Sequence, residues 1–151
     1  MAANTAPIFT DVPLVGAGVW TSSLTANTRS DGTGTIGTDM VKLLTAGADG
    51  AFVNRIRLSP AASTAATSTT ASVARFYIST VTSGATTRAD TFPFAEVAVA
   101  SQSVDTTTTG VTYFEVPCGF YIPTGYYIHF SMHHAAAANS SWTAIVFGGN
   151  Y

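Results

Sequence analysis

Charged side chains are scarce in this chain of 151 residues: six Lys and Arg and eight Asp and Glu together make up 9% of it. About a quarter is usual for a soluble domain. The formal net charge of −2 leaves little long-range field that would attract nucleic acid or an anionic membrane. No stretch is long and apolar enough to span a bilayer. We therefore expect neither nucleic acid nor a membrane as a partner.

Cysteine occurs once, which excludes an internal disulfide. Cys118 stands between Pro117 and Gly119 and beside the aromatic Phe120, a context that predicts a buried, inert thiol rather than a nucleophile. The N-terminal sequence MAANTAP has neither the basic flank nor the apolar core of a secretory signal. Synthesis and folding in a cytoplasm are the expectation.

Signatures of catalysis are also missing, since there is no G-x-S-x-G elbow, no H-E-x-x-H and no P-loop. Gly32, Gly34 and Gly37 match the letters of G-x-G-x-x-G, but the segment before them is polar and no helical pattern follows, so we predict a flexible Gly/Thr loop. The eight carboxylates are scattered, mostly beside turn-forming residues. The sequence thus predicts neither an enzyme nor a cofactor, with glycan hydrolysis as the enzymatic alternative.

Histidine occurs three times, as His129, His133 and His134. On a helix the first two would stand one turn apart and could share a metal ion. In a strand they would lie about 13 Å apart, too far to reach one zinc ion. We therefore predict no metal site and interpret the three as surface or interface residues. A site completed by a carboxylate from another strand or subunit stays open.

Thr and Ser are abundant, about a quarter of the chain, and nine Phe, six Tyr and two Trp supply the large apolar side chains of a core. Strand-like alternation is clearest in three segments. In the first segment, one face carries Phe52, Asn54, Ile56 and Leu58 and the other Val53, Arg55, Arg57 and Ser59. In the second, Ala74, Phe76 and Ile78 are expected inward and Val73, Arg75, Tyr77 and Ser79 outward. In the third, one face carries Tyr126, Ile128, Phe130 and Met132 and the other Tyr127, His129, Ser131 and His133.

Other β-branched or aromatic runs predict strands at residues 18–24, 40–45, 95–104, 111–116, 120–122 and 142–147. Residues 61–72 and 135–141 are rich in Ala but show no helical stripe, so we interpret them as surface loops. Many short strands with polar connections predict an all-β fold, an antiparallel β-sandwich of jelly-roll type. Trp20, Phe76 and Trp142 are expected in its core.

The domain prediction is an extended N-terminal arm, residues 1–13, followed by a single sandwich domain, residues 14–151. In the arm, Ile8 and Phe9 follow Pro7, and these apolar side chains either fold back as an edge strand or reach a neighbouring subunit. Sheet edges raise the same question, because Lys42 is the one lysine available to guard them. Two alternatives follow: either closure of the sandwich, prolines and loops protect the sheet edges, or an assembly covers them.

Three of the six cations, Arg55, Arg57 and Arg75, are expected to point outward from two predicted strands. Pairing with Glu or Thr across strands is the simpler interpretation. Contact with an acidic partner surface is the alternative. The candidate interface residues are therefore Pro7, Ile8, Phe9, Arg55 and Arg57.

Several short segments resemble small proteins encoded among the virion-assembly genes of tailed bacteriophages and prophages. They are NTAPIFT at residues 4–10, TANT at 25–28, DGTGT at 31–35, VNRIR at 53–57 and the terminal GGNY at 148–151. The insertion at residues 61–72 and the His133-His134 pair are not features of that group. The resemblance implies a structural virion protein: a decoration or cement protein that binds the major capsid protein on the outer capsid surface as a homo-oligomer, often a trimer.

The alternative is a glycan- or receptor-binding jelly-roll module of a phage tail spike or fibre. Such a module would present exposed aromatic rings to a sugar, and Tyr113, Tyr121 and Tyr127 are the candidates.

Overall fold

The computed structural model describes residues 12–63, 67–107 and 112–151. Their regular secondary structure is entirely β, and the twelve strands are β1 (Val12–Trp20), β2 (Gly34–Ile36), β3 (Val41–Thr45), β4 (Ala51–Ala62), β5 (Thr67–Ser68), β6 (Ser72–Ser79), β7 (Gly84–Thr86), β8 (Thr91–Val99), β9 (Ser103–Val104), β10 (Phe114–Ile122), β11 (Tyr127–Met132) and β12 (Ser140–Asn150). These ranges contain no helix long and apolar enough to cross a membrane.

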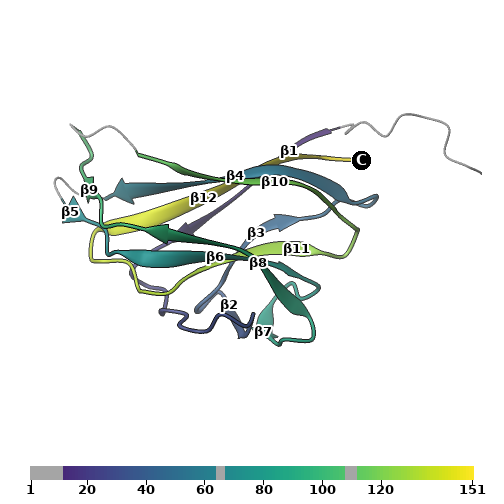
Figure 1. Ribbon diagram of the computed structural model, residues 1–151, viewed down its shortest axis with the longest axis horizontal. Helices are drawn as coiled ribbons and strands as arrows, with labels where there is room; N and C mark the ends of the chain where they lie inside the picture. Colours follow the sequence, from purple (N-terminus) through teal and green to yellow (C-terminus); the bar gives the residue numbers. More distant parts are fainter. Residues whose placement is uncertain (1–11, 64–66, 108–111) are drawn as a thin grey trace, which may run out of the picture.

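Two four-stranded antiparallel sheets pack face to face, with strand orders β1-β12-β4-β10 and β3-β11-β6-β8 (Figure 1). Along the chain, the eight long strands alternate between the sheets except where β6 leads directly to β8. This order, in which the first strand pairs with the last, is that of a jelly roll. The predicted all-β, jelly-roll-like sandwich is therefore confirmed.

The core lies between the two sheets and is filled by aliphatic and aromatic side chains, including Trp20, Phe76 and Trp142 as expected. A run of aromatic contacts crosses it. The Trp20 ring packs edge-on against Phe130, with ring centres 5.9 Å apart, and Phe130 stacks on Phe76 at 5.4 Å. The ring centres of Phe76 and Phe94 lie 6.4 Å apart. Because Trp20 belongs to one sheet and the other rings to the second, these contacts tie the sheets together.

The sandwich is closed on the side where β1 meets β3. Gly16 and Gly18 make this approach possible, because a Cβ on Gly16 would overlap the Leu43 carbonyl oxygen and a Cβ on Gly18 would press on Val41. Glycine thus allows two edge strands from different sheets to cover each other. On this side of the sandwich, contact between the two sheets covers the edge strands β1 and β3.

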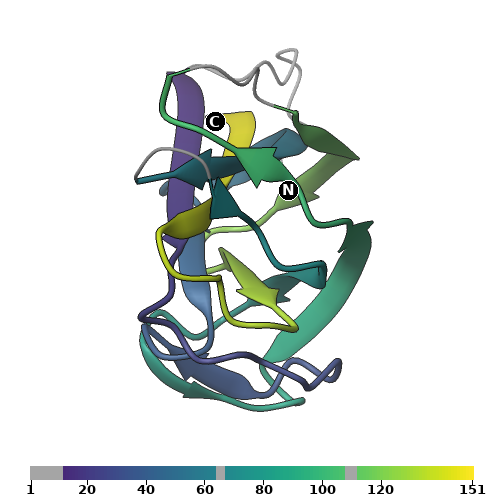
Figure 2. The ribbon, with the colours of Figure 1, turned by 90° about the vertical axis from the view of Figure 1, so that its left-hand side faces the viewer.

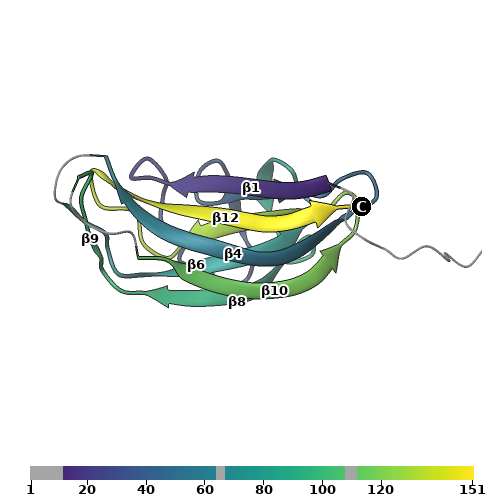
Figure 3. The same cartoon turned by 90° about the horizontal axis from the view of Figure 1, so that it is seen from above.

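On the opposite side, the edge strands β8 and β10 run along the same side of the sandwich (Figure 3). Each carries a proline and a bulge: Pro93 is followed by a register shift in β8, and Pro117 by one in β10. Proline lacks an N–H and a bulge distorts the ladder, so neither edge is a good template for another strand. Phe94 and Phe120, 5.1 Å apart, pack across this side.

The outer face of the β3-β11-β6-β8 sheet is covered by other parts of the chain. Residues 21–40, with β2, and residues 80–90, with β7, lie beneath this sheet (Figures 1 and 2), and β2 pairs with β7. Side chains that alternation predicts as outward are therefore buried. They are Arg75, Tyr77, Ser79, His129 and Ser131.

This covered face is polar and internally hydrogen-bonded. Arg75 donates to Glu96 Oε1 at 2.6 Å and to the carbonyl oxygen of Asn27 at 3.1 Å. The Tyr77 and Ser131 hydroxyls lie 3.1 Å apart. The expectation that Arg75 and Tyr77 face outward is wrong, because the Thr- and Gly-rich segments 21–40 and 80–90 fold onto this face of the sheet.

The Gly32-Gly34-Gly37 segment belongs to this cover. It includes β2, and Gly32, with φ of 86°, lies so close to the Thr91 carbonyl oxygen that a Cβ would overlap it. Asp31 accepts hydrogen bonds from the amide and hydroxyl of Thr33. The predicted Gly/Thr loop is thus a set of turns around the short strand β2, and its glycines allow close packing and turning.

Several strand limits also differ from the expected ones. β1 begins at Val12, within the predicted arm, and residues 21–24 form a turn instead of continuing it. β4 runs on to Ala62, and β5 lies within the segment interpreted as a loop. The runs at 111–116 and 120–122 share the single strand β10, and the run at 95–104 divides between β8 and β9.

Candidate binding face

The outer face of the β1-β12-β4-β10 sheet carries no covering layer among the described residues (Figures 1 and 3). We call it the bare face. The β1 strand presents exposed apolar side chains on it: Val15 is 64% exposed and Val19 46%. β1 contains no charged residue, and neighbouring exposed apolar side chains on one sheet face are a feature of interaction sites.

The strand register arranges these side chains in rows across the bare face. One row runs Val15, Phe147, Arg55, Pro117, and the next runs Ala17, Ile145, Arg57, Glu115. In these two rows the apolar side chains lie on β1 and β12 and the charged groups on β4 and β10, whereas the next row, Val19, Thr143, Ser59, is more polar. The face is apolar at one side and carries a compact ionic cluster at the other.

The ionic cluster contains two guanidinium groups and one carboxylate. Glu115 Oε1 accepts hydrogen bonds from Nη2 and Nε of Arg57, at 2.8 and 3.3 Å, and lies 3.6 Å from Nε of Arg55. The hydrogen bond from Arg57, followed by the charges of both arginines, lowers the pKa of Glu115. Cross-strand pairing, the simpler interpretation of these arginines, is confirmed for Arg57 and, with Glu96 on the other sheet, for Arg75.

Aromatic rings hold both arginines in place. The Arg55 guanidinium carbon lies 4.9 Å from the centre of the Phe147 ring, and that of Arg57 lies 4.3 Å from Tyr113. Such cation–π contacts limit the side-chain freedom of long arginines on a surface. Arg75, grouped with them by sequence, belongs to the covered face of the other sheet.

A β-bulge hollows the bare face at Asn54. Phe147 pairs with Arg55 and Gly148 with Val53, so Asn54 has no partner in the ladder. The bulge also shifts the alternation: Val53 is buried in the core, whereas Asn54 is exposed and Phe52 is half-buried on the outer side. The prediction that Phe52 and Asn54 share a face with the core residue Ile56 is wrong for this reason.

The hollow beside the bulge is a groove of about 300 Å³. Its lining combines aromatic rings, two glycines and two polar side chains: Phe52, Asn54, Arg55, Phe147, Gly148 and Gly149. A Cβ on Gly148 would overlap the carbonyl oxygen of Phe52, so glycine is required there for the strands to approach. The pair Gly148-Gly149 within a β-branched and aromatic run was the available sequence signal for this feature.

The remaining predicted interface residues, Pro7, Ile8 and Phe9, lie outside the described residues. Their prediction therefore stays a prediction.

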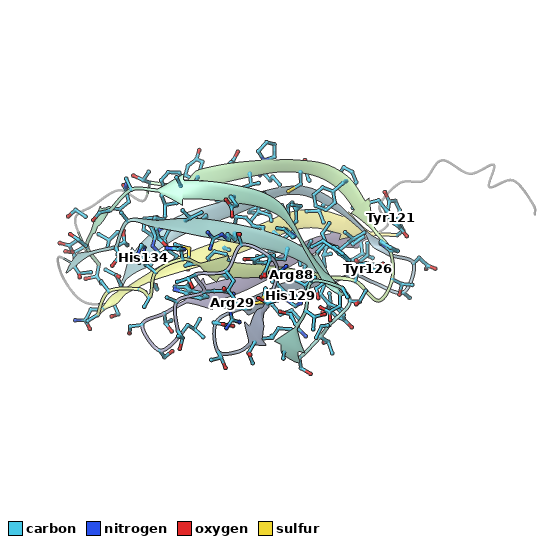
Figure 4. All side chains as sticks on the ribbon, turned by 60° about the horizontal axis from the view of Figure 1, so that its bottom comes forward. Arg29, Arg88, Tyr121, Tyr126, His129 and His134 are labelled. Atoms are coloured by element: carbon cyan, nitrogen blue, oxygen red, sulfur yellow. The ribbon has the colours of Figure 1, made fainter. Side chains whose placement is uncertain are left out.

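His129 is fully buried, so its interpretation as a surface or interface residue is wrong. Its Nε2 lies 2.8 Å from the carbonyl oxygen of Val81, and its Nδ1 is buried without a partner. Nε2 therefore carries the proton and donates to Val81. Burial lowers the pKa of His129, because the charged imidazolium would have to form away from water. Figure 4 labels His129 with Arg29 and Arg88, which belong to the segments covering this sheet.

His133 and His134 follow the end of β11 at Met132, and their ring centres lie 4.7 Å apart. His133 Nδ1 is 3.4 Å from Nη1 of Arg75, and His134 Nδ1 is 3.1 Å from the carbonyl oxygen of Ala71. Within residues 12–63, 67–107 and 112–151, no three His, Cys, Asp or Glu side chains gather closely enough to hold a metal ion. The histidines serve local structure in this arrangement.

Cys118 is half-buried on β10, and its Sγ lies 3.5 Å from the carbonyl oxygen of Val116. Burial raises the pKa of the thiol to about 11. The thiolate is the reactive form, so this cysteine is a poor nucleophile at neutral pH.

The three tyrosines considered for sugar stacking do not share a platform. Tyr113 precedes β10, Tyr121 lies near its other end, and Tyr127 belongs to the second sheet. Tyr121 donates to the carbonyl oxygen of Asp49 and packs against Tyr151. Figure 4 shows Tyr121 at the end of the molecule where Tyr126 also lies.

No protein-family model and no curated protein sequence matches the chain. Among solved structures, it is similar to a chain of the cyanophage Pam1 capsid asymmetric unit, with a TM-score of 0.40 and 15% identity over 97% of this chain and 93% of that one. It is also similar to a chain of the T13 IBDV viral particle, with a TM-score of 0.31 and 14% identity over 99% of this chain and 35% of that one. Both are chains of viral particles.

Proposed function

We propose that this chain is a structural protein of a virion, a decoration or cement protein that binds the outer capsid shell and stabilises it. The observation that carries the proposal is the bare face: an uncovered sheet surface with exposed valines on β1 and Phe147 and Arg55 near its centre, in a protein whose other sheet is covered. Water alone does not favour such a surface, whereas a protein partner would bury it. The sequence resemblance to small virion proteins names the class of partner, the major capsid protein.

The jelly-roll fold supports the proposal without deciding it, because this fold recurs in capsid and lectin domains alike. The sheet edges add a further argument. One edge of each sheet is closed by the contact of Gly16 with Leu43, and the others carry Pro93 and Pro117 beside bulges. Strand addition is thereby disfavoured, and a face is left as the means of association.

Attachment through a face suits a cement protein. A shell offers the same binding position many times by symmetry, and each copy that spans two capsid subunits resists their separation. An oligomer, which we propose to be a trimer, engages several positions at once, so that modest contacts add up to durable attachment. Pro7, Ile8 and Phe9 of the arm precede Val12, the exposed first residue of β1. We propose that this arm extends the contact to the shell or to a neighbouring copy.

The test is the copy number of this chain in purified particles, measured by mass spectrometry against the major capsid protein. A decoration protein is expected at hundreds of copies per particle. A handful of copies would contradict the capsid role and favour a tail spike or fibre module, and absence from particles would contradict any structural role. Light scattering of the purified protein tests the trimer separately.

A further inference from the structure

The groove at the Asn54 bulge contains Arg55, which shares the Glu115 carboxylate with Arg57. Glu115 accepts hydrogen bonds from Arg57 alone, and one carboxylate faces two guanidinium groups, so the cluster keeps one net positive charge. Arg55 donates no hydrogen bond to any described residue: its Nε lies 3.6 Å from Glu115 Oε1, within ion-pair distance but too far for a hydrogen bond. The Arg55 side chain is 41% exposed, so an incoming acceptor can reach its guanidinium and form hydrogen bonds that no described residue makes.

The surroundings of Arg55 suit a planar acidic group. The Phe147 ring lies beneath its guanidinium, and Asn54, exposed in the bulge, adds an amide with both donors and an acceptor. The guanidinium is a fork of donors that matches a carboxylate with two parallel hydrogen bonds. The glycines Gly148 and Gly149 leave the space beside it open.

We propose that this groove binds the carboxylate of an aspartate or glutamate side chain on the capsid shell protein. The inference rests on the proposed function and assigns the residue at the centre of its interface. The neighbouring Val15 and Ile145 would pack on apolar side chains around that carboxylate and keep water out, which strengthens a charged hydrogen bond. A protein is favoured over an acidic glycan, because a sugar would meet mainly apolar side chains beyond the groove.

The experiment measures binding of the purified, full-length protein to particles produced after deletion of its gene. Arg55→Gln removes the charge and keeps a polar side chain of similar length, and we expect it to weaken binding about tenfold or more. Arg55→Lys keeps the charge without the fork and should fall between this variant and the wild type. Both are compared with the wild type by thermal unfolding.

Arg88→Gln is the matched control, because Arg88 is also an exposed arginine paired with a carboxylate, Asp31, but belongs to the covered side of the molecule. It should bind within about twofold of wild type. If Arg55→Gln loses its fold, Arg55→Lys decides: a loss of binding supports the inference, and wild-type affinity overturns it.

Equal binding of wild type and Arg55→Gln would overturn the inference and leave the capsid function standing. Failure of the wild type itself to bind these particles would overturn both. Binding to polysaccharide extracted from the host surface in place of the particles, lost in Arg55→Gln, would assign the groove to a glycan and also overturn the inference.

Discussion

Gly16 of β1 lies against the main chain of Leu43 in β3, so closely that a Cβ on Gly16 would overlap the Leu43 carbonyl oxygen. The two residues belong to different sheets, and their contact closes one side of the sandwich. β1 also forms the outermost strand of the bare face, so this contact fixes the position of the rows of side chains that begin at Val15 and Ala17.

Replacing Gly16 with alanine should therefore destabilise the fold. The added methyl group meets main-chain atoms that cannot rotate away, and we expect a loss of about 2 kcal/mol or more in the free energy of unfolding, measured in urea. Ala17→Ser, at the neighbouring outward position, is the control and should change stability by about 0.5 kcal/mol or less. Equal stabilities of the two variants would contradict the closure of β1 on β3.

The buried arginine of the covered face should hold the covering segment in place. Arg75→Leu removes the hydrogen bonds to the carbonyl oxygens of Asn27 and Arg29. We expect a loss of about 1–3 kcal/mol and faster amide hydrogen exchange in residues 25–36. Arg88→Gln should leave exchange there nearly unchanged, since that side chain is exposed. Unchanged exchange in Arg75→Leu would show that the segment is held by other contacts.

The sequence could predict the core because alternation is reliable where one side of a strand faces apolar neighbours: Phe76, Ile128 and Phe130 lie where the pattern puts them. The sequence could not predict whether the opposite side of each strand is exposed to solvent or covered. Arg75 and His129 alternate correctly but are covered by segments with no pattern of their own, and such long-range packing leaves no local signal.

Stability should decline in mild acid because of His129. Its folded-state pKa lies below the unfolded value of about 6.5, so the unfolded chain binds a proton first as the pH falls. The stabilising contribution is complete above about pH 6.5 and is lost as the pH falls toward the lower folded pKa. The free energy of unfolding in urea, measured at pH 7.5 and at pH 5, gives the size of this loss.

The variant His129→Gln keeps an amide donor for the Val81 carbonyl oxygen and removes the titrating group. The difference in stability between pH 7.5 and 5 should be smaller in this variant than in the wild type. An identical difference in both proteins would show that another group causes the pH dependence.

Cys118 should react slowly with thiol reagents. Because its pKa is raised to about 11, the thiolate is a minor species at pH 8, and burial restricts access as well. We expect alkylation by iodoacetamide to be at least tenfold slower than for a free cysteine under the same conditions, and to accelerate as the pH approaches 11. Fast reaction at pH 8 would contradict the burial of the thiol.

The candidate site was only half predictable from the sequence. The sequence predicts Arg55 and Arg57 as outward residues because arginine on an alternating strand is conspicuous, and it predicts only the residue type of their partner, Glu115. The groove was missed, since it depends on one unpaired residue, Asn54, and a bulge arises from the pairing of two strands far apart in sequence.

The most direct test of the account is an electron cryomicroscopy reconstruction of the particle that carries this protein. The account predicts density for the jelly roll on the outer shell, with the β1-β12-β4-β10 face toward the major capsid protein and a carboxylate within hydrogen-bonding distance of Arg55. A jelly roll attached through the side covered by β2 and β7, with Val15 and Phe147 turned to solvent, would contradict it.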